Sequence, residues 1–203
     1  MVSGTIFEVR GVSKHFGGIA ALFDVGFTVR AGEVLGLIGP NGAGRTTLFE
    51  CLAGVLPVDH GAIYVDDRAI GTERRKALLF YVPDAIAPWA SQSVRWALEY
   101  VIGLFGGSTA SRPLVIEQLG LHPLLNQSIG TLSKGQRKRV LLAIGPLTPA
   151  PVLLVDEPFD GLDLRQARDV AAALVPTRNT AARSFCRFIR SLTPGVSAIA
   201  LCC

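Results

Sequence analysis

The sequence of 203 residues has only three histidines, one methionine and no long uninterrupted apolar run. Its longest apolar stretch, residues 140–155, contains one glycine and three prolines, so it is too short and too broken to cross a bilayer. Glu8 and Arg10 interrupt the segment in which a signal peptide would have its apolar core. These absences predict a globular chain that reaches a membrane only through a partner.

Acidic residues and lysines are absent from residue 170 onward, although four arginines occur there. These arginines account for the net charge of +4, because residues 1–169 carry 16 basic and 16 acidic side chains. A neutral body predicts no basic face and no nucleic acid partner. None of the four cysteines has metal-site spacing with a histidine, which indicates the reducing cytoplasm and not a zinc site.

Apolar segments rich in valine, isoleucine and phenylalanine alternate with helical patterns along the chain. Strands are predicted at 5–10, 20–30, 34–38, 62–65, 78–82 and 152–155, and helices at 44–53 and 164–174, with a helical pattern over 91–145. Strands that alternate with helices around an all-helical insertion predict an α/β fold with a parallel sheet and a helical subdomain.

A glycine-rich segment joins the predicted strand at 34–38 to the following helix. It follows the phosphate-loop pattern GxxxxGK[ST], with Arg45 in place of lysine. Glycines allow backbone N–H groups to surround a phosphate, and Thr46 offers a hydroxyl to Mg²⁺. A glycine-rich turn before a helix is the simpler alternative. The candidate nucleotide-binding residues here are Gly39, Pro40, Asn41, Gly42, Ala43, Gly44, Arg45, Thr46 and Thr47.

Two adjacent carboxylates follow the apolar segment at 152–155. Asp156 and Glu157 stand where a buried strand is predicted to end, and open α/β sheets have their chemistry at the carboxyl ends of strands. Asp156 is expected to hold Mg²⁺ through water, and Glu157 to polarise the attacking water as a general base. An acidic pair that only forms a turn before Pro158 is the alternative. The spacing after the phosphate loop favours the catalytic interpretation.

A third motif, LSKGQ at residues 132–136, lies between the phosphate loop and the carboxylates. The three motifs together resemble those of the ATP-binding cassette (ABC) family, whose LSGGQ signature is rare elsewhere and has lysine at its third position in some members. Residues 21–54 are similar to the family pattern throughout, and residues 159–163 resemble its D-loop. Phe16 stands where the family stacks an aromatic ring on adenine. The resemblance covers residues 5–174.

The resemblance implies a P-loop NTPase fold: a parallel sheet with an antiparallel N-terminal β subdomain and an inserted helical subdomain at about 85–145, within an ATPase domain at 1–175. It implies ATP and Mg²⁺ as ligands and a second ABC cassette as a head-to-tail partner. Each ATP would lie between one phosphate loop and the partner's signature. Capping of a helix is a compatible structural role for Ser133. The residues implied at this interface are Ser133, Lys134, Gly135 and Gln136 of the signature, and Gly161, Leu162 and Asp163 of the D-loop.

Transport is the activity that the resemblance implies. The spacing from Arg45 to Ser133 leaves no room for the coiled-coil or zinc-bearing insertions of chromosome-maintenance relatives, and the length excludes two-cassette translation factors. We expect an ATP-hydrolysing subunit, peripheral on the inner face of the cell membrane, that drives integral membrane subunits. Those subunits choose the substrate. The compact helical insertion at 91–130 is similar to that of two-component exporters.

Three departures from the family pattern concern the chemistry. Arg45 places a planar guanidinium where a compact ammonium is usual, which predicts weakened ATP binding or a misplaced γ-phosphate, with strongly reduced hydrolysis. Asp84 stands where the Q-loop glutamine is usual; its carboxylate can approach Mg²⁺, and a surface turn acid is the alternative. The switch histidine is expected about thirty residues beyond Glu157, but all three histidines lie upstream.

The stretch at 176–203 is atypical, because it lacks acidic residues and contains three of the four cysteines. A shifted reading frame near Val175 is one explanation, and a divergent tail is the other. A shifted frame predicts that the last core strand and helix are missing, although 197–201 has the composition of a strand.

Arg45 and the missing histidine also suit a second function, a degenerate cassette that binds ATP without hydrolysing it. The retained Glu157 favours hydrolysis. A phosphate-loop kinase or GTPase is disfavoured by the signature.

Overall fold

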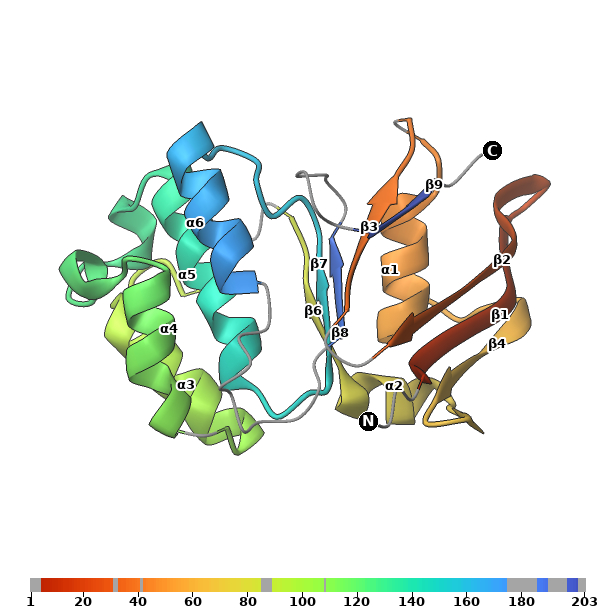
Figure 1. Ribbon diagram of the computed structural model, residues 1–203, viewed down its shortest axis with the longest axis horizontal. Coiled ribbons are helices and arrows are strands. Elements are labelled where there is room, and N and C mark those ends of the chain that lie inside the picture. The colour runs from red at the N-terminus through yellow and green to blue at the C-terminus, as the bar shows by residue number, and fades with distance from the viewer. Residues whose placement is uncertain are drawn as a thin grey trace. The chain divides into compact units, whose positions relative to one another are not determined.

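The computed structural model describes residues 5–30, 33–40, 42–84, 89–107, 109–174, 186–189 and 197–200 (Figure 1). The chain divides into two compact units. The first comprises Met1–Tyr81, Ala150–Asp156 and Pro176–Cys203, and the second comprises Val82–Pro149 and Glu157–Val175. No helix among the described residues has the length and apolarity that a membrane span requires.

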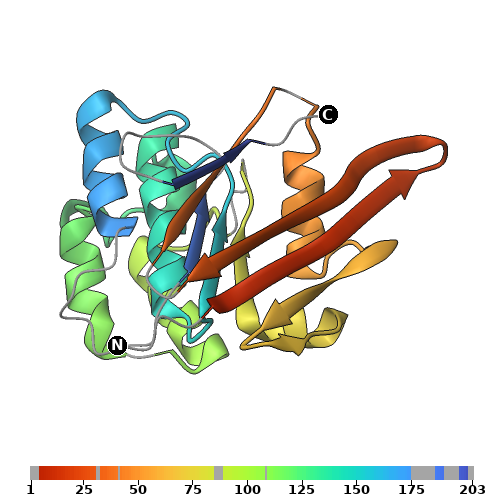
Figure 2. The same cartoon turned by 45° about the vertical axis from the view of Figure 1, so that its right-hand side comes forward.

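The first unit contains an antiparallel sheet, in the strand order β2-β1-β4-β5. Valine, isoleucine and phenylalanine alternate with polar residues in its long strands, as expected for a sheet with one buried face. β1 and β2 form a long hairpin (Figure 2), in which β1 extends six residues beyond the predicted strand. The strands are β1 (Thr5–Phe16), β2 (Ile19–Arg30), β4 (His60–Val65) and β5 (Arg68–Ala69).

The five-stranded sheet of the chain has the order β6-β7-β8-β3-β9. β8 pairs in parallel with both β7 and β3, and β9 pairs in parallel with β3. All four residues of β7 are buried, which explains its continuous apolar sequence. The strands are β3 (Val34–Ile38), β6 (Leu79–Val82), β7 (Val152–Val155), β8 (Cys186–Ile189) and β9 (Ser197–Ala200).

The expectation that the last core strand is missing is wrong, because β8 and β9 both lie in this sheet. Ladder hydrogen bonds use backbone groups, so a short segment with strand-forming residues can pair whatever the composition around it. β9 agrees with the strand expected from the composition of 197–201. The expectation that the last core helix is also missing concerns residues outside those that the structure describes.

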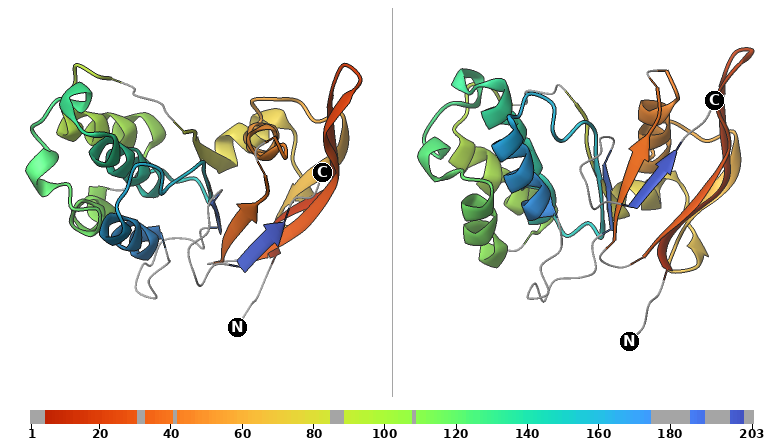
Figure 3. Two further views of the ribbon diagram at one scale, coloured as in Figure 1. Left: turned by 90° about the horizontal axis from the view of Figure 1, so that it is seen from above. Right: turned by 45° about the horizontal axis from the view of Figure 1, so that its top comes forward.

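Helix α1 (Arg45–Ala53) lies between the two sheets within the first unit, as Figures 1 and 3 show. Leu48, Phe49 and Leu52 on this helix are fully buried. They share one apolar core with residues of β1, β2, β3, β4 and β7. Gly54 ends the helix in the left-handed conformation, with φ of 77°, as its position in the sequence predicts.

The polar helix α2 (Thr72–Leu78) also belongs to the first unit and was not predicted. Arg75 on this helix is 4% exposed. Its guanidinium donates to the carbonyl oxygen of Cys51 in α1 and to Oγ1 of Thr72. Burial lowers the pKa of Arg75 and raises the pKa of the Cys51 thiol. The hydrogen bonds of Arg75 therefore hold α2 to the core. The sequence of α2 has no apolar periodicity, so no pattern predicted this helix.

The second unit is helical, as predicted. Helix α5 packs against α3 and α4, and α4 packs against α6 (Figure 3). Ser93 caps α3 through a hydrogen bond from the Trp96 backbone N–H to its hydroxyl (3.2 Å). The helices are α3 (Val94–Phe105), α4 (Arg112–Gln118), α5 (Lys134–Leu147) and α6 (Leu164–Leu174), with short 3₁₀ turns at Thr109–Ser111, His122–Leu124 and Ile129–Thr131.

Candidate nucleotide-binding site

The phosphate-loop strand and the carboxylate strand end at the same edge of the parallel sheet. Ile189 of β8 is the register partner of Gly36 in β3 on one side and of Val155 in β7 on the other. Since all three strands run in parallel, the loop that follows Ile38 and the carboxylate of residue 156 both leave the sheet at its carboxyl edge. This edge is where open α/β sheets have their ligand sites.

The loop between β3 and α1 depends on glycine at two described positions. Gly42 and Gly44 have φ of 87° and 74°, a region that side chains rarely occupy. A Cβ on Gly44 would also overlap the carbonyl oxygen of Ala21 in β2. The backbone N–H of Ala43 donates to the carbonyl oxygen of Pro40 (3.2 Å), so the segment turns tightly before the helix. Asn41 lies outside the described residues.

Arg45 is the first residue of α1, and it is only 8% exposed. It is followed by Thr46 and Thr47, which are half-buried. The N-terminus of α1 therefore carries a guanidinium that is largely withdrawn from solvent, together with two hydroxyl groups. A helix N-terminus favours anions, because its first backbone N–H groups have no partner within the helix.

The two predicted acidic residues differ in their surroundings. Asp156 directly follows β7 and is 2% exposed, whereas Glu157 is half-buried. Glu157 has φ of 46°, an uncommon conformation for a residue other than glycine. Strained backbone of this kind is concentrated at functional sites. The backbone N–H of Asp160 donates to the carbonyl oxygen of Glu157 (3.2 Å), so a tight turn begins at this residue.

The signature segment (residues 132–136) opens helix α5. The hydroxyl of Ser133 accepts a hydrogen bond from the Gln136 backbone N–H (3.2 Å), and Oε1 of Gln136 accepts one from the Ser133 backbone N–H (2.9 Å). This reciprocal pair is a capping box. The structural role expected for Ser133 is thereby confirmed.

The D-loop segment (residues 159–163) lies against the signature segment within the second unit. A Cβ on the buried Gly135 would come within 2.9 Å of the Gly161 carbonyl oxygen, so only glycine permits this approach. Nζ of Lys134 forms an ion pair with Oδ2 of Asp160 (2.7 Å). Asp163 caps α6 by accepting a hydrogen bond from the Gln166 backbone N–H (2.8 Å).

Sequence comparison identifies the family. The pattern described as ABC transporter matches residues 22–160 of this chain. The chain belongs to the ABC transporter family. Its fold is the ATP-binding cassette fold.

Relatives and a solved structure agree with this assignment. The chain is 32% identical to the uncharacterised ABC transporter ATP-binding protein YhcH of Bacillus subtilis (strain 168) over 183 residues, which cover 87% of this chain and 60% of the relative. It is 39% identical over 139 residues to the cytochrome c biogenesis ATP-binding export protein CcmA of Xanthomonas oryzae pv. oryzae, with 68% of this chain and 65% of the relative covered. The chain thus spans somewhat less than two thirds of the length of these two proteins.

The solved structure of an ATP-binding subunit of an ABC transporter superposes with a TM-score of 0.78 at 25% identity, covering 93% of this chain and 80% of that one. The predicted P-loop NTPase fold, with its antiparallel β subdomain and helical segment, is confirmed.

Phe16, at the position of the family's adenine-stacking aromatic ring, ends strand β1 and is 50% exposed. Nζ of Lys14 lies 5.7 Å from the centre of its ring. The same ammonium pairs with Oδ1 of Asp59 (2.7 Å), whose other oxygen accepts the His15 backbone N–H (2.7 Å). An exposed aromatic face on an anchored strand end can stack on a planar ring.

Asp84, expected at the Q-loop position, has a partner that the sequence did not predict. Nζ of Lys138 in α5 donates to Oδ1 of Asp84 at 2.6 Å. The side chain of Lys138 is 5% exposed and that of Asp84 is 32% exposed. The carboxylate considered as a magnesium ligand is therefore engaged by a buried ammonium.

The remaining oxygen donors suit Mg²⁺. Asp156 and Thr46 both belong to the first unit, and carboxylate and hydroxyl oxygens are hard ligands. Among the residues that the structure describes, no group of three or more His, Cys, Asp or Glu side chains could hold a metal. Mg²⁺ commonly uses one or two protein carboxylates together with phosphate oxygens, so this sparse donor set fits an ion that arrives with a nucleotide.

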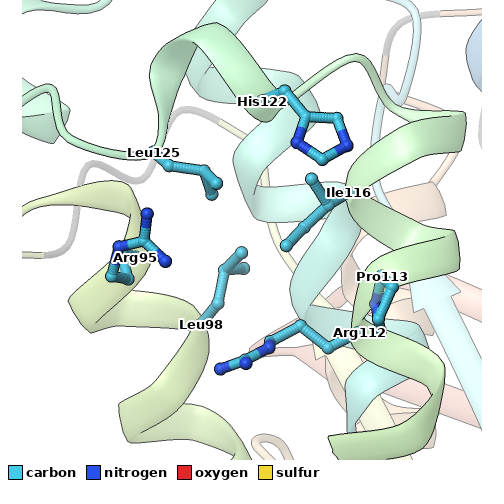
Figure 4. Close-up of a pocket in the computed structure, with 7 residues that line it drawn as sticks. All are labelled: Arg95, Leu98, Arg112, Pro113, Ile116, His122 and Leu125. Carbon is cyan, nitrogen blue, oxygen red and sulfur yellow. The ribbon is translucent and has the colours of Figure 1, made fainter.

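A separate cavity of about 230 Å³ lies within the helical unit (Figure 4). Leu98 and Ile116 line it together with Arg95, Arg112 and His122. Its lining residues include neither a glycine-rich loop nor a carboxylate, so it differs in chemistry from the candidate nucleotide-binding site at the sheet edge. Arg112 is already paired with Glu99 (3.1 Å).

Proposed function

We propose that this chain binds Mg-ATP on its phosphate loop and hydrolyses it to power transport through separate integral membrane subunits. The observation that supports the proposal most directly is the shared register of Gly36 and Val155 across β8. It brings the phosphate loop and Asp156 to one edge of one sheet. A glycine-rich loop, a helix N-terminus and a buried carboxylate are the elements that phosphoryl transfer requires.

Each residue of the site has a role in this proposal. Gly39, Gly42 and Gly44 donate backbone N–H groups to the phosphates, and the α1 N-terminus with Thr47 adds positive potential and a hydroxyl. Thr46 and Asp156 hold Mg²⁺, directly or through water. The bound ion neutralises charge on the phosphate oxygens. Glu157 accepts a proton from the attacking water, and Phe16 stacks on the adenine.

The partner in catalysis is a second ABC cassette, arranged head to tail. The signature residues Ser133, Lys134, Gly135 and Gln136 then bring the N-terminus of α5 to the γ-phosphate of the partner's ATP, because a helix N-terminus favours an anion. Gly161, Leu162 and Asp163 face the same interface. The membrane subunits hold the complex on the inner face of the cell membrane. Export is the direction that we propose, on the similarity to CcmA and the compact helical insertion.

Hydrolysis is slow in this proposal. A planar guanidinium at position 45 replaces the compact ammonium that fits the phosphate cradle, and the two groups differ in shape and hydrogen-bond geometry. Arg45 is 8% exposed at the first position of α1, so it has little room to reorient. The absence of a histidine downstream of Glu157 acts in the same direction.

A degenerate cassette that binds ATP without turnover is the second candidate. The buried Arg45 is the observation that favours it. Glu157 favours the first candidate, because a cassette without turnover does not need a general base. The two candidates agree on ATP binding and differ in whether the γ-phosphate is released.

Separate measurements of binding and turnover test the proposal. We expect titration calorimetry to show Mg²⁺-dependent ATP binding by the natural chain and by Glu157→Gln, and phosphate release by the natural chain alone. Sedimentation should show an ATP-dependent dimer of Glu157→Gln. Asp156→Asn should weaken the Mg²⁺ dependence. ATP affinity that is unaffected by both Mg²⁺ and Asp156→Asn would overturn the proposed site, and binding without any phosphate release would favour the degenerate cassette.

A further inference from the structure

Two lysines of α5, one helical turn apart, each form an ion pair with an aspartate. Each of these aspartates lies shortly after a position at which the chain enters the second unit. Lys138 pairs with Asp84, in the unit's first segment, which begins at Val82. Lys134 pairs with Asp160, in its second segment, which begins at Glu157. Residues at i and i+4 lie on one face of a helix. We call these two ion pairs the lysine clasp.

The Lys138–Asp84 pair is the buried half of the clasp. The Lys138 side chain is 5% exposed, and its Nζ lies 2.6 Å from Oδ1 of Asp84. A buried ammonium is stabilised by a nearby opposite charge, so moving Asp84 toward another cation would cost the 2.6 Å ion pair with Lys138. The Q-loop position is therefore held to the signature helix.

The Lys134–Asp160 pair is the exposed half. Its side chains are 65% and 42% exposed, so the ion pair alone contributes little to stability. Close packing supports it, because a Cβ on Gly161 would come within 2.8 Å of Cδ of Lys134. The hydrogen bond between the two groups raises the pKa of Lys134 and lowers the pKa of Asp160. The D-loop segment is thus seated on the first turn of α5.

The Lys134–Asp160 ion pair is connected to Glu157 by a backbone hydrogen bond. The carboxylate of Asp160 is held by Lys134, and the Asp160 backbone N–H donates to the Glu157 carbonyl oxygen (3.2 Å). Glu157 has φ of 46°, so the surrounding turn has to maintain an unfavourable conformation. Loss of the ion pair would loosen this turn without removing any group from Glu157 itself.

We infer that Lys134 and Lys138 are positioning residues, which use Asp160 and Asp84 to hold the D-loop and Q-loop segments to the signature helix, so that the three move together and Glu157 keeps its orientation. This inference rests on the proposed function for its catalytic consequence. The clasp itself is a property of the nucleotide-free chain, and it can be tested without ATP.

The first test is hydrogen exchange of the Asp160 and Leu162 amides, which donate within the D-loop turn. In the nucleotide-free full chain, we expect about two- to fivefold faster exchange in Lys134→Gln and in Asp160→Asn, as the loss of an exposed ion pair predicts. Arg112→Gln is the matched control, because it removes the Arg112–Glu99 ion pair of the same unit. Unchanged exchange in both clasp variants would overturn the inference.

The second test measures turnover in an Arg45→Lys background. We expect Lys134→Gln and Asp160→Asn each to lower kcat several-fold with KM for ATP within about twofold, because only the orientation of the base changes. Their losses should not add in the double variant, since both remove one interaction. Additive losses, or a loss in Lys134→Gln alone, would show that Lys134 acts directly on a phosphate and would overturn its positioning role.

The buried half has its own discriminating pair of variants. Asp84→Asn should lower the melting temperature, because it removes the negative charge 2.6 Å from the buried ammonium of Lys138. Lys138→Met in the same chain should restore much of it. Turnover should remain low in the double variant, since the loop is no longer held. If the double variant recovered both kcat and the melting temperature, the Lys138–Asp84 pair would have only a structural role.

If no variant hydrolysed ATP, the proposed function would be rejected. The hydrogen-exchange test would then decide by itself whether the lysine clasp holds the D-loop segment.

Discussion

The α-carbon of Gly44 lies so close to the carbonyl oxygen of Ala21 that a methyl group at position 44 would overlap this oxygen. β2 thereby fixes the position of the phosphate loop within the first unit. We expect Gly44→Ala to lower the free energy of unfolding, measured in urea, by about 1–3 kcal/mol through overpacking. The same substitution should lower the affinity for ATP at least tenfold.

Gly42→Ala is the matched control for this prediction. Gly42 also has positive φ, but a Cβ there would meet no atom within 4 Å. Only the conformational cost of about 1–2 kcal/mol remains. Equal effects of the two substitutions on stability and on ATP affinity would contradict the proposed contact with β2.

Arg45→Lys should raise the rate of ATP hydrolysis. The ammonium is compact and can enter the phosphate cradle, whereas the guanidinium fork is wider and planar. We expect kcat to rise about tenfold or more, which corresponds to about 1.4 kcal/mol of activation free energy. Phosphate release at saturating Mg-ATP measures the change, and Arg45→Ala, which removes the charge, should bind ATP more weakly than either. The natural chain and Arg45→Lys having the same rate would contradict the prediction.

Ser133→Ala and Ser93→Ala form a matched pair of helix-cap variants. Both serines accept a backbone N–H at the start of a helix of the second unit, at 3.2 Å in each case. Each substitution should cost about 1 kcal/mol of unfolding free energy. Only Ser133→Ala should weaken the ATP-dependent dimer of the Glu157→Gln background, because only Ser133 lies in the signature segment. Equal dimer stability in the two variants would show that Ser133 only caps its helix and does not contribute to the ATP-dependent dimer.

The Asp59 carboxylate should make stability depend on acidic pH. Its pKa is lowered, first by the hydrogen bond from Lys14 and then by that from the His15 backbone N–H. The carboxylate therefore stabilises the fold above the pKa of the unfolded chain, and this contribution is lost as the pH falls through the lower pKa of the folded state. Asp59→Asn should reduce the difference in melting temperature between pH 6 and the acidic range. An unchanged pH profile would contradict the assignment.

The local architecture of the site followed from sequence patterns. The run at Val34–Ile38, glycines 39, 42 and 44 and the helix to Gly54 predicted a strand, a loop and α1, because periodicity and glycine placement are local signals. The buried strand before Asp156 was predicted for the same reason. The polar helix α2 was missed, since Arg75 anchors it by hydrogen bonds and not by an apolar face.

The contacts that join distant segments could not be predicted in the same way. Lys138 and Asp84 are 54 positions apart, and Lys134 and Asp160 are paired across a complete helix and strand. No local pattern indicates such pairs, and the sequence assigned Asp84 to a metal or to a turn. The strand at Cys186–Ile189 was missed because composition describes a whole segment, whereas strand pairing depends on a few residues.

The central position of β8 has a consequence for biosynthesis. The strand that carries the phosphate loop and the strand that precedes Asp156 are not neighbours, and both depend on a segment that the ribosome makes roughly 150 residues after β3. Pairings this distant in sequence form slowly. A nascent chain could fold its antiparallel hairpin and its helices early, yet the proposed ATP site would not be assembled until β8 had emerged. If the proposed site binds nucleotide, the nucleotide can stabilise the chain only after β8 has paired, and it cannot guide earlier folding.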